Sequence, residues 1–167
     1  IINIYNMLAV ITLLREFGMP AEQINNTLKK QKIVETRYSE ETINGKKIIN
    51  HLAKGMNPIA CSRVFDYIRK EPGKKAVILI LDDFHDAHNS SENITWHYDT
   101  DYEFLNDNSI KQVITAGARH WDTYIRLELA GVPEEKIVHT RNELDSTKNL
   151  NIKESILNFM LIFSLFS

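Results

Sequence analysis

Two groups of side chains in this sequence have the residue types for chemistry. The first follows an apolar run and consists of Asp82, Asp83, His85, Asp86 and His88. Carboxylates and imidazoles this close together could surround a divalent ion, but their spacing matches no fixed ligand motif. Loops after strands are polar in any case, so we predict no dedicated metal site here. A phosphoacceptor pocket of the receiver kind is also disfavoured, because the chain lacks an earlier acidic pair and a clear late lysine.

The second group is a pair of aspartates, Asp99 and Asp101, which lie among Trp96, Tyr98 and Tyr102. Aromatic neighbours can hold a carboxylate in a partly buried place. There it can orient and charge-stabilise a histidine, the third role in a Cys-His-Asp arrangement. Alternatively, either carboxylate could cap a helix that begins near Tyr102 by accepting main-chain N–H bonds. The residues alone favour the cap.

The sequence offers no convincing nucleophile for a triad of its own. Cys61 is the one cysteine, and no histidine is paired with it by spacing. A buried structural cysteine is the commoner case for such a residue, and a single cysteine indicates a reducing cytoplasm. If an aspartate of this chain serves a triad, the cysteine and the histidine belong to another chain.

Several polar side chains could face phosphates or carboxylates, and arginine suits bidentate contact with either. They are Arg37, Lys54, Asn57, Arg119 and Arg126. No glycine-rich loop of the form G-x-x-x-x-G-K-[ST] occurs in the sequence. We therefore expect that this chain alone neither binds and hydrolyses ATP by that route nor hydrolyses glutamine.

The composition is that of a globular protein. The chain has 167 residues, of which 43% are hydrophobic, enough to fill a core. The formal net charge of −2, from 20 basic and 22 acidic residues, gives no electrostatic signature of nucleic-acid binding or of a membrane surface.

The elements that must position these side chains alternate between strand and helix. Residues 76–81 form an unbroken apolar run typical of a central parallel strand, and sites collect beyond the carboxyl ends of such strands. Helices are predicted over 59–70 and 118–130, a short helix over 101–106, and further strands over 110–115 and 136–140. This order predicts an α/β fold with a Rossmann-like, mostly parallel sheet flanked by helices.

The two ends of the chain have different patterns. Helical spacing predicts two helices before residue 34, separated by Gly18 and Pro20, and Asn44-Gly45 predicts a hairpin turn. Residues 156–166 are densely apolar but far short of the roughly 20 residues that span a bilayer. We predict a buried terminal element there, or a terminus that aggregates, and no transmembrane segment.

Three stretches of the sequence resemble motifs of one family. Ile94-Thr-Trp-His-Tyr-Asp-Thr-Asp-Tyr-Glu103 is similar to a Ser-Trp-Ile-Trp-Asp-x-Asp-Phe-Glu motif, which is the most specific match. Ala53-Lys-Gly-Met-Asn-Pro58 resembles a Lys-Asn-Pro-Ala-Gly turn, and Leu81-Asp-Asp-Phe-His-Asp86 resembles an Asn-Asp-Asn-x-Ala-Asp loop. The family is MurT, the Mur ligase-like subunit of lipid II isoglutaminyl synthase.

Weaker matches extend the resemblance over about residues 3–138. They comprise residues 3–9, Arg37 in place of a Gly-Arg pair, Gly117-Ala-Arg119, and Arg126-Leu127. The resemblance implies that residues 1–34 are the helical tail of a Mur ligase central domain. Residues 35–167 would then be the C-terminal α/β domain.

The resemblance also implies an activity. Such enzymes use ATP and Mg²⁺, bound mainly by the central domain, to activate the D-glutamate α-carboxylate of lipid II as an acyl phosphate, and ammonia then yields isoglutamine. A GatD-type glutaminase releases the ammonia from glutamine with its cysteine and histidine. Work at the cytoplasmic face of the membrane is implied as well.

Residue roles carry over from the family to matching positions. Asp99, with Asp101 as the alternate, would complete the partner's Cys-His site, which reverses the preference for a cap. Arg37, Lys54, Asn57 and Arg119 would face nucleotide or substrate.

This sequence departs from the family pattern at several places. Gly-Met is inserted between Lys54 and Asn57, Asp82 and Phe84 replace two asparagines, and His97 replaces an apolar residue. The tail lacks the family's Tyr-Thr-rich closing strand, which puts the stability of a sheet edge in question. The alternative functions are a non-catalytic Rossmann-like binding module, or the domain of another Mur-type amide ligase.

Overall fold

The computed structural model describes residues 4–30, 38–52, 57–83, 93–151 and 157–165 of the chain. The chain divides into two compact units, residues 1–34 and residues 35–167.

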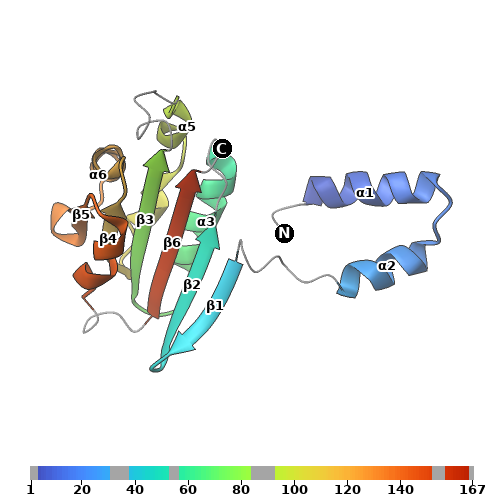
Figure 1. Ribbon diagram of the computed structural model, residues 1–167, viewed down its shortest axis with the longest axis horizontal. Helices are drawn as coiled ribbons and strands as arrows, with labels where there is room; N and C mark the ends of the chain where they lie inside the picture. The colour runs from blue at the N-terminus through green and yellow to red at the C-terminus, as the bar shows by residue number, and fades with distance from the viewer. Residues whose placement is uncertain (1–3, 31–37, 53–56, 84–92, 152–156, 166–167) are drawn as a thin grey trace. The chain divides into compact units, whose positions relative to one another are not determined.

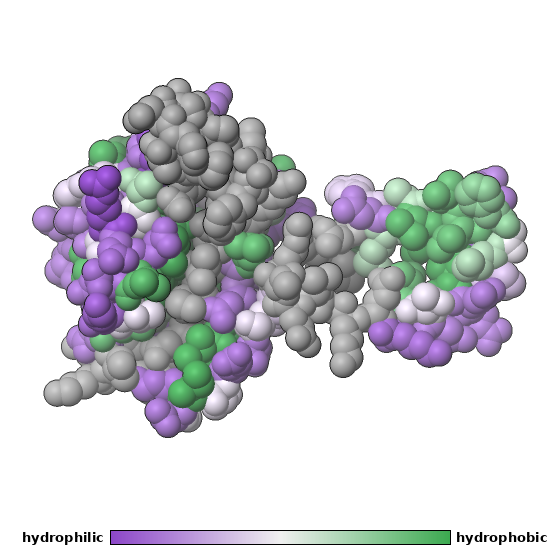
Figure 2. All heavy atoms as spheres, in the orientation of Figure 1, coloured by the Kyte–Doolittle hydropathy of each residue, from purple (hydrophilic) through white to green (hydrophobic). Residues whose placement is uncertain are grey.

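The first unit is a pair of helices, α1 (Ile4–Glu16) and α2 (Ala21–Lys30), as the helical spacing predicted. Gly18 adopts φ +80° between them, a conformation that favours glycine. Ile24 of α2 is buried, whereas α1 has no buried residue and exposes large apolar side chains such as Leu13 and Phe17. Figure 2 shows these hydrophobic side chains gathered over α1.

The second unit begins with the predicted hairpin. Strands β1 (Tyr38–Ile43) and β2 (Lys46–Leu52) pair antiparallel around Asn44 and Gly45, which have φ of 52° and 76°. Positive φ at both central residues is the signature of a type I′ turn, whose twist matches that of the flanking strands.

The sheet has six strands in the order β1-β2-β6-β3-β4-β5. Strands β3 (Lys75–Asp83), β4 (Ile110–Ala116), β5 (Ile137–Thr140) and β6 (Leu157–Leu165) run parallel to one another and to β2. Consecutive residues Ala76 to Leu79 of β3 are at most 1% exposed, so this strand is covered on both faces. A Rossmann-like, mostly parallel sheet is confirmed (Figure 1).

The apolar tail supplies a central strand of this sheet. β6 pairs with β2 on one side and with β3 along its whole length on the other. The tail is therefore a central strand and not part of the sheet edge whose stability the departure from the family pattern put in question. A dense apolar run is typical of a central strand in a parallel sheet, because such strands are covered on both faces.

Two helices pack against the sheet, α3 (Pro58–Lys70) and α6 (His120–Leu129). Phe65 of α3 and Leu127 of α6 belong to one buried cluster with Val77 and Leu79 of β3. Pro58 stands at the first position of α3, where its missing N–H costs nothing. Short 3-10 turns cover Glu134–Lys136, Glu143–Asp145 and Thr147–Asn149.

The short helix predicted over 101–106 is present as a 3-10 turn, and a further short helix that was not predicted precedes it. Helix α5 (Thr95–Tyr98) and the 3-10 turn η1 (Tyr102–Leu105) flank Asp99, Thr100 and Asp101. Residues 95–105 are called the aspartate turn below. In Figure 1, α5 lies beyond the carboxyl end of β3, where α/β folds place their sites.

Candidate functional site

The two predicted aspartates of the aspartate turn have exposed side chains. Asp99 follows α5, and Asp101 stands at the N-cap position of η1 without a side-chain capping bond. Within the described parts of the chain, neither carboxylate accepts a hydrogen bond from another group. The cap alternative therefore finds no support, and both acidic side chains face outward.

Asp99 and Asp101 line a shallow groove of about 400 Å³ beside α3, called the α3 groove below. Asp66 of α3 is bound by Arg69 at 2.7 Å and also by Lys70. Arg69 in turn lies 4.2 Å from the ring centre of Phe104. The groove lining comprises Pro58, Ile59, Ser62, Arg63, Asp66, Arg69, Lys70, Asp99, Asp101 and Phe104.

Buried polar groups hold the backbone beneath the two carboxylates. The main-chain N–H of Asp101 donates to Ser62 Oγ at 2.9 Å, which ties the turn to α3. Thr100 Oγ1 donates to the main-chain oxygen of Trp96 at 3.1 Å. On the other side, Arg126 Nη2 donates to Thr100 O at 2.8 Å and to both Glu103 carboxylate oxygens at 2.9 Å. The turn is thus anchored to both α3 and α6.

A further bond joins two buried side chains across the turn. Tyr102 Oη lies 2.9 Å from His97 Nδ1, and the two residues are 2% and 1% exposed. Burial, together with the Arg126 charge, lowers the pKa of His97 to about 4. The ring is neutral at physiological pH, and the histidine tautomer sets which of the two atoms donates the proton.

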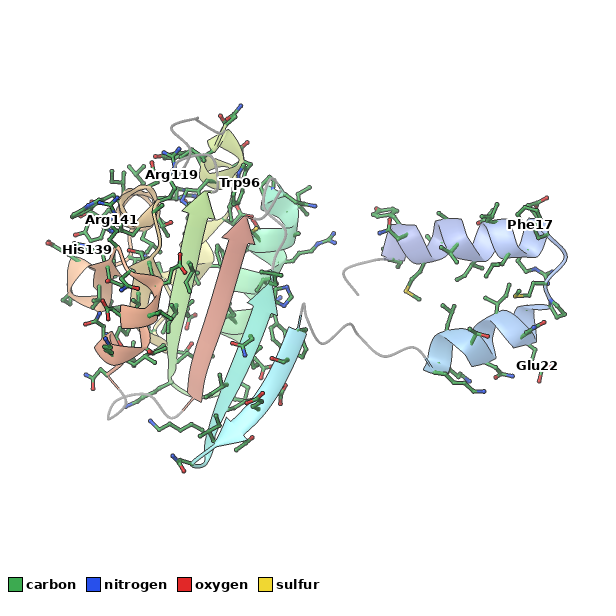
Figure 3. The ribbon with its side chains drawn as sticks, viewed as in Figure 1. Phe17, Glu22, Trp96, Arg119, His139 and Arg141 are labelled. Carbon is green, nitrogen blue, oxygen red and sulfur yellow. The ribbon has the colours of Figure 1, made fainter. Side chains whose placement is uncertain are left out.

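Of the predicted nucleotide-facing residues, Asn57 and Arg119 lie in the part of the chain that the structure describes. Asn57 is used locally: its side-chain oxygen accepts the N–H of Ala60 at 3.0 Å as the N-cap of α3. Arg119 donates its main-chain N–H to Leu81 O, and its Nη1 lies 3.5 Å from Asp122. Figure 3 shows Arg119 and Trp96 at the carboxyl end of β3. Arg37 and Lys54 lie outside the described residues.

Arg126, which could have faced a phosphate, is an interior residue instead. It is 7% exposed and binds the chain's own Glu103 and Thr100. The sequence carried no sign of this pairing, because Arg126 and Glu103 lie on elements that meet only in the fold.

Cys61 is buried in the core. Burial raises the pKa of its thiol to about 12. A thiol that stays protonated at neutral pH is a poor nucleophile, in agreement with the structural role favoured from the sequence.

The acidic loop gives no further information on a metal. Asp82 and Asp83 end β3, while His85, Asp86 and His88 lie outside the described residues. The metal prediction stays a prediction.

Comparison with known proteins decides the family. The model of the MurT ligase C-terminal family matches residues 52–164, more than half of the chain. The chain belongs to the MurT family. This family match includes α3, the aspartate turn and most of the sheet.

Two MurT relatives carry the name lipid II isoglutaminyl synthase (glutamine-hydrolyzing) subunit MurT. The Streptococcus pneumoniae protein is 29% identical over 84% of this chain and 30% of its own length. The Staphylococcus aureus protein (strain COL) is 28% identical over 90% of this chain and 33% of its own. The chain thus spans about a third of the relatives' length. Their name marks each as one subunit of an assembly.

The fold is that of the Mur ligases. The crystal structure of UDP-N-acetylmuramate-alanine ligase MurC from Thermotoga maritima matches with a TM-score of 0.65 at 14% identity. The match covers 96% of this chain and 34% of that one, and it bears on the fold alone.

No helix in the described part of this MurT-family chain is long and apolar enough to cross a membrane. The buried residues beneath the aspartates, His97, Tyr102 and Arg126, were not predicted from the sequence. The cluster of aromatic residues around Asp99 indicated a partly buried turn. It did not show which side chains would contact that turn.

Proposed function

We propose that this chain is the C-terminal part of an ATP- and glutamine-dependent amidotransferase subunit. The full enzyme amidates the D-glutamate α-carboxylate of lipid II to isoglutamine. The family membership and the names of the relatives support this proposal. The alternative is a non-catalytic binding module of the same fold, or another Mur-type amide ligase domain.

One observation carries the catalytic part of the proposal. Asp99 presents an exposed carboxylate from a turn whose backbone is fixed by buried hydrogen bonds. Functional groups act best when rigid neighbours hold them in place. A carboxylate held this way on the surface suits a role on a second protein rather than inside this one.

The chemistry assigned to Asp99 is the orientation of a histidine. A glutaminase cysteine attacks the glutamine amide, and its histidine transfers protons during acyl transfer. A carboxylate bound to the far ring nitrogen holds the histidine in one tautomer and stabilises the imidazolium. Asp101 is the alternate, because it lines the same groove and its main chain is held by Ser62.

The partner is a GatD-type glutaminase, which supplies the cysteine and the histidine. Any protein that brings a histidine to Asp99 must cover the α3 groove. Ile59, 65% exposed at this groove, offers an apolar anchor, and Arg63 is exposed beside it. An apolar anchor beside exposed charges is typical of protein interfaces.

ATP and Mg²⁺ belong to the rest of the polypeptide in this proposal. Among the described residues, Asn57 caps α3 and Arg119 lies beside Asp122, and the proposal assigns no phosphate site to this pair. No catalytic step through the nucleotide is assigned to this domain.

The test uses the full-length protein with its glutaminase and the variant Asp99→Asn, which removes the charge but keeps the shape. In serine-protease triads the equivalent change costs about 10⁴-fold, and a cysteine site with a preformed thiolate loses less. Glutamine-dependent amidation should collapse, while amidation with added ammonia continues because it bypasses the glutaminase.

Other outcomes would redirect the proposal. A parallel loss of both routes would make Asp99 a folding or nucleotide-site residue. Loss of the glutamine route in Asp101→Asn but not in Asp99→Asn would move the role by two positions. Failure of the wild-type protein to co-elute with any candidate glutaminase would favour the non-catalytic module.

A further inference from the structure

His97 and Tyr102 form the one hydrogen-bonded pair of buried side chains within the described aspartate turn. His97 lies two residues before Asp99 and Tyr102 three residues after it, with Oη and Nδ1 2.9 Å apart. Their rings also meet edge to face, with centroids 4.9 Å apart. The bond therefore joins α5 to η1 across the aspartate.

The other anchors of the turn act mainly on its second half. Ser62 holds the main chain of Asp101, and Arg126 holds Thr100 and Glu103. On the first half, Thr100 Oγ1 reaches the main chain of Trp96, and His97 is held through Tyr102. Loss of the His97 bond would leave α5 and the following Asp99 with fewer constraints than the residues after them.

We propose that the His97–Tyr102 hydrogen bond positions Asp99 for its contact with the glutaminase histidine. This inference rests on the proposed function of Asp99. His97 and Tyr102 are positioning residues, because both lie in the interior and act only through the carboxylate beside them.

The physical basis is the cost of breaking one half of a buried polar pair. Removing the phenol oxygen leaves His97 Nδ1 buried without its hydrogen-bond partner, and replacing the imidazole leaves the Tyr102 phenol without its partner. A buried group without its partner is more costly than a pair replaced entirely by apolar groups. The turn can relieve the cost only by shifting, and a carboxylate displaced by about 1 Å no longer meets its target well.

A matched replacement removes both polar members of the pair together. Isoleucine at position 97 and phenylalanine at position 102 are apolar and fill much of the same volume. The double variant His97→Ile, Tyr102→Phe should keep the turn in place through packing, with no polar group left unpaired.

The experiment is a double-mutant cycle in the full-length protein with its glutaminase subunit. The variants are His97→Ile, Tyr102→Phe and their combination, with Asp99→Asn measured alongside. Glutamine-dependent and ammonia-dependent amidation are both followed, and kcat and KM for glutamine are separated. All rates are taken well below the unfolding temperature of each variant, which is measured in parallel. Tyr124→Phe is the control, because it removes a phenol oxygen on α6 that lies outside the aspartate turn.

Each single variant should lower the glutamine-dependent kcat about tenfold, with little change in KM and an unchanged ammonia-dependent rate. The double variant should recover to near the wild-type rate, and Tyr124→Phe should resemble wild type. Such a recovery would not follow from two independent structural defects, which multiply.

Three results would overturn the inference. Single variants could retain the glutamine-dependent rate while Asp99→Asn loses it, which spares the proposed function but removes the positioning role. The single losses could multiply in the double variant, or appear equally in the ammonia route, which indicates a purely structural pair. A full rate in Asp99→Asn would remove the positioning role of the pair for Asp99, and a full rate in both Asp99→Asn and Asp101→Asn would overturn the proposed function itself.

Discussion

The main-chain N–H of Asp101 donates a hydrogen bond to Ser62 Oγ at 2.9 Å. This contact joins two segments that are far apart in the sequence, α3 and the aspartate turn, and it brings both aspartates to the α3 groove. Ser62→Ala should destabilise the domain by about 1 kcal/mol, because the amide loses its acceptor in a partly buried place. Chemical denaturation measures this change. Thr42→Ala, at an exposed position of β1, is the control, and an equal effect of both variants would contradict a special role for Ser62.

The Arg126 contacts predict a larger loss of stability. Arg126→Met keeps much of the side-chain volume but removes the bonds to Thr100 O and to Glu103. We expect a loss of about 2 kcal/mol, below the cost of a fully buried pair because the Glu103 side chain is 55% exposed. Thermal unfolding measures it. A variant as stable as wild type would show that the carboxylate and the carbonyl are satisfied without the arginine.

The N-cap of α3 separates a structural from a nucleotide-binding role for Asn57. Asn57→Ala should cost about 1 kcal/mol in unfolding free energy, whereas Asn57→Asp should keep the cap. In the full-length enzyme, neither change should alter the KM for ATP. A raised KM for ATP in both variants would restore the nucleotide-facing role predicted from the family turn.

His97 makes part of the stability dependent on pH. Folding lowers its pKa from 6.5 to about 4, so between these values the unfolded chain binds a proton that the folded chain does not. Its contribution, about 3 kcal/mol, is present above pH 6.5 and is lost as the pH falls through 4. Unfolding free energies from pH 7 to pH 4 should therefore fall more steeply in wild type than in the His97→Ile, Tyr102→Phe variant. If the unfolding free energies of the two proteins fell equally with pH, a group other than His97 would be responsible for the pH dependence.

The exposed side chain of Ile59 predicts where the glutaminase binds. Ile59→Asp should weaken association with the glutaminase at least tenfold, since a charge would replace an apolar anchor. Ile43→Asp, at the end of β1 and 49% exposed, is the matched control and should leave the affinity unchanged. Isothermal titration calorimetry measures the affinity of each variant for the glutaminase. If Ile43→Asp alone weakened binding, the partner would cover the hairpin rather than the α3 groove.

Much of the fold could be predicted because its signals are local. Asn44-Gly45 gave the hairpin turn, and the apolar run 76–81 gave the central parallel strand. The place of β6 could not be predicted in the same way, since pairing with β2 and β3 depends on contacts far apart in the sequence. An apolar run shows that a segment is buried but does not show which strands accept it.

The site was predictable only in part, for a related reason. Asp99 and Asp101 were singled out from their residue types and from the family motif. Their supports, Ser62 and Arg126, come from helices whose packing no sequence pattern reveals. The capping alternative was reasonable from spacing alone. It found no support because Asp101, at the N-cap position of η1, makes no side-chain capping bond.

The central claim is that Asp99 reaches the active-site histidine of a glutaminase partner. An experimental structure of the full complex with a glutamine analogue bound measures this directly. One carboxylate oxygen of Asp99 should lie within about 3.2 Å of the histidine ring nitrogen that faces away from the cysteine. A structure in which that nitrogen binds a carboxylate of the glutaminase itself, with Asp99 in solvent, would contradict the account.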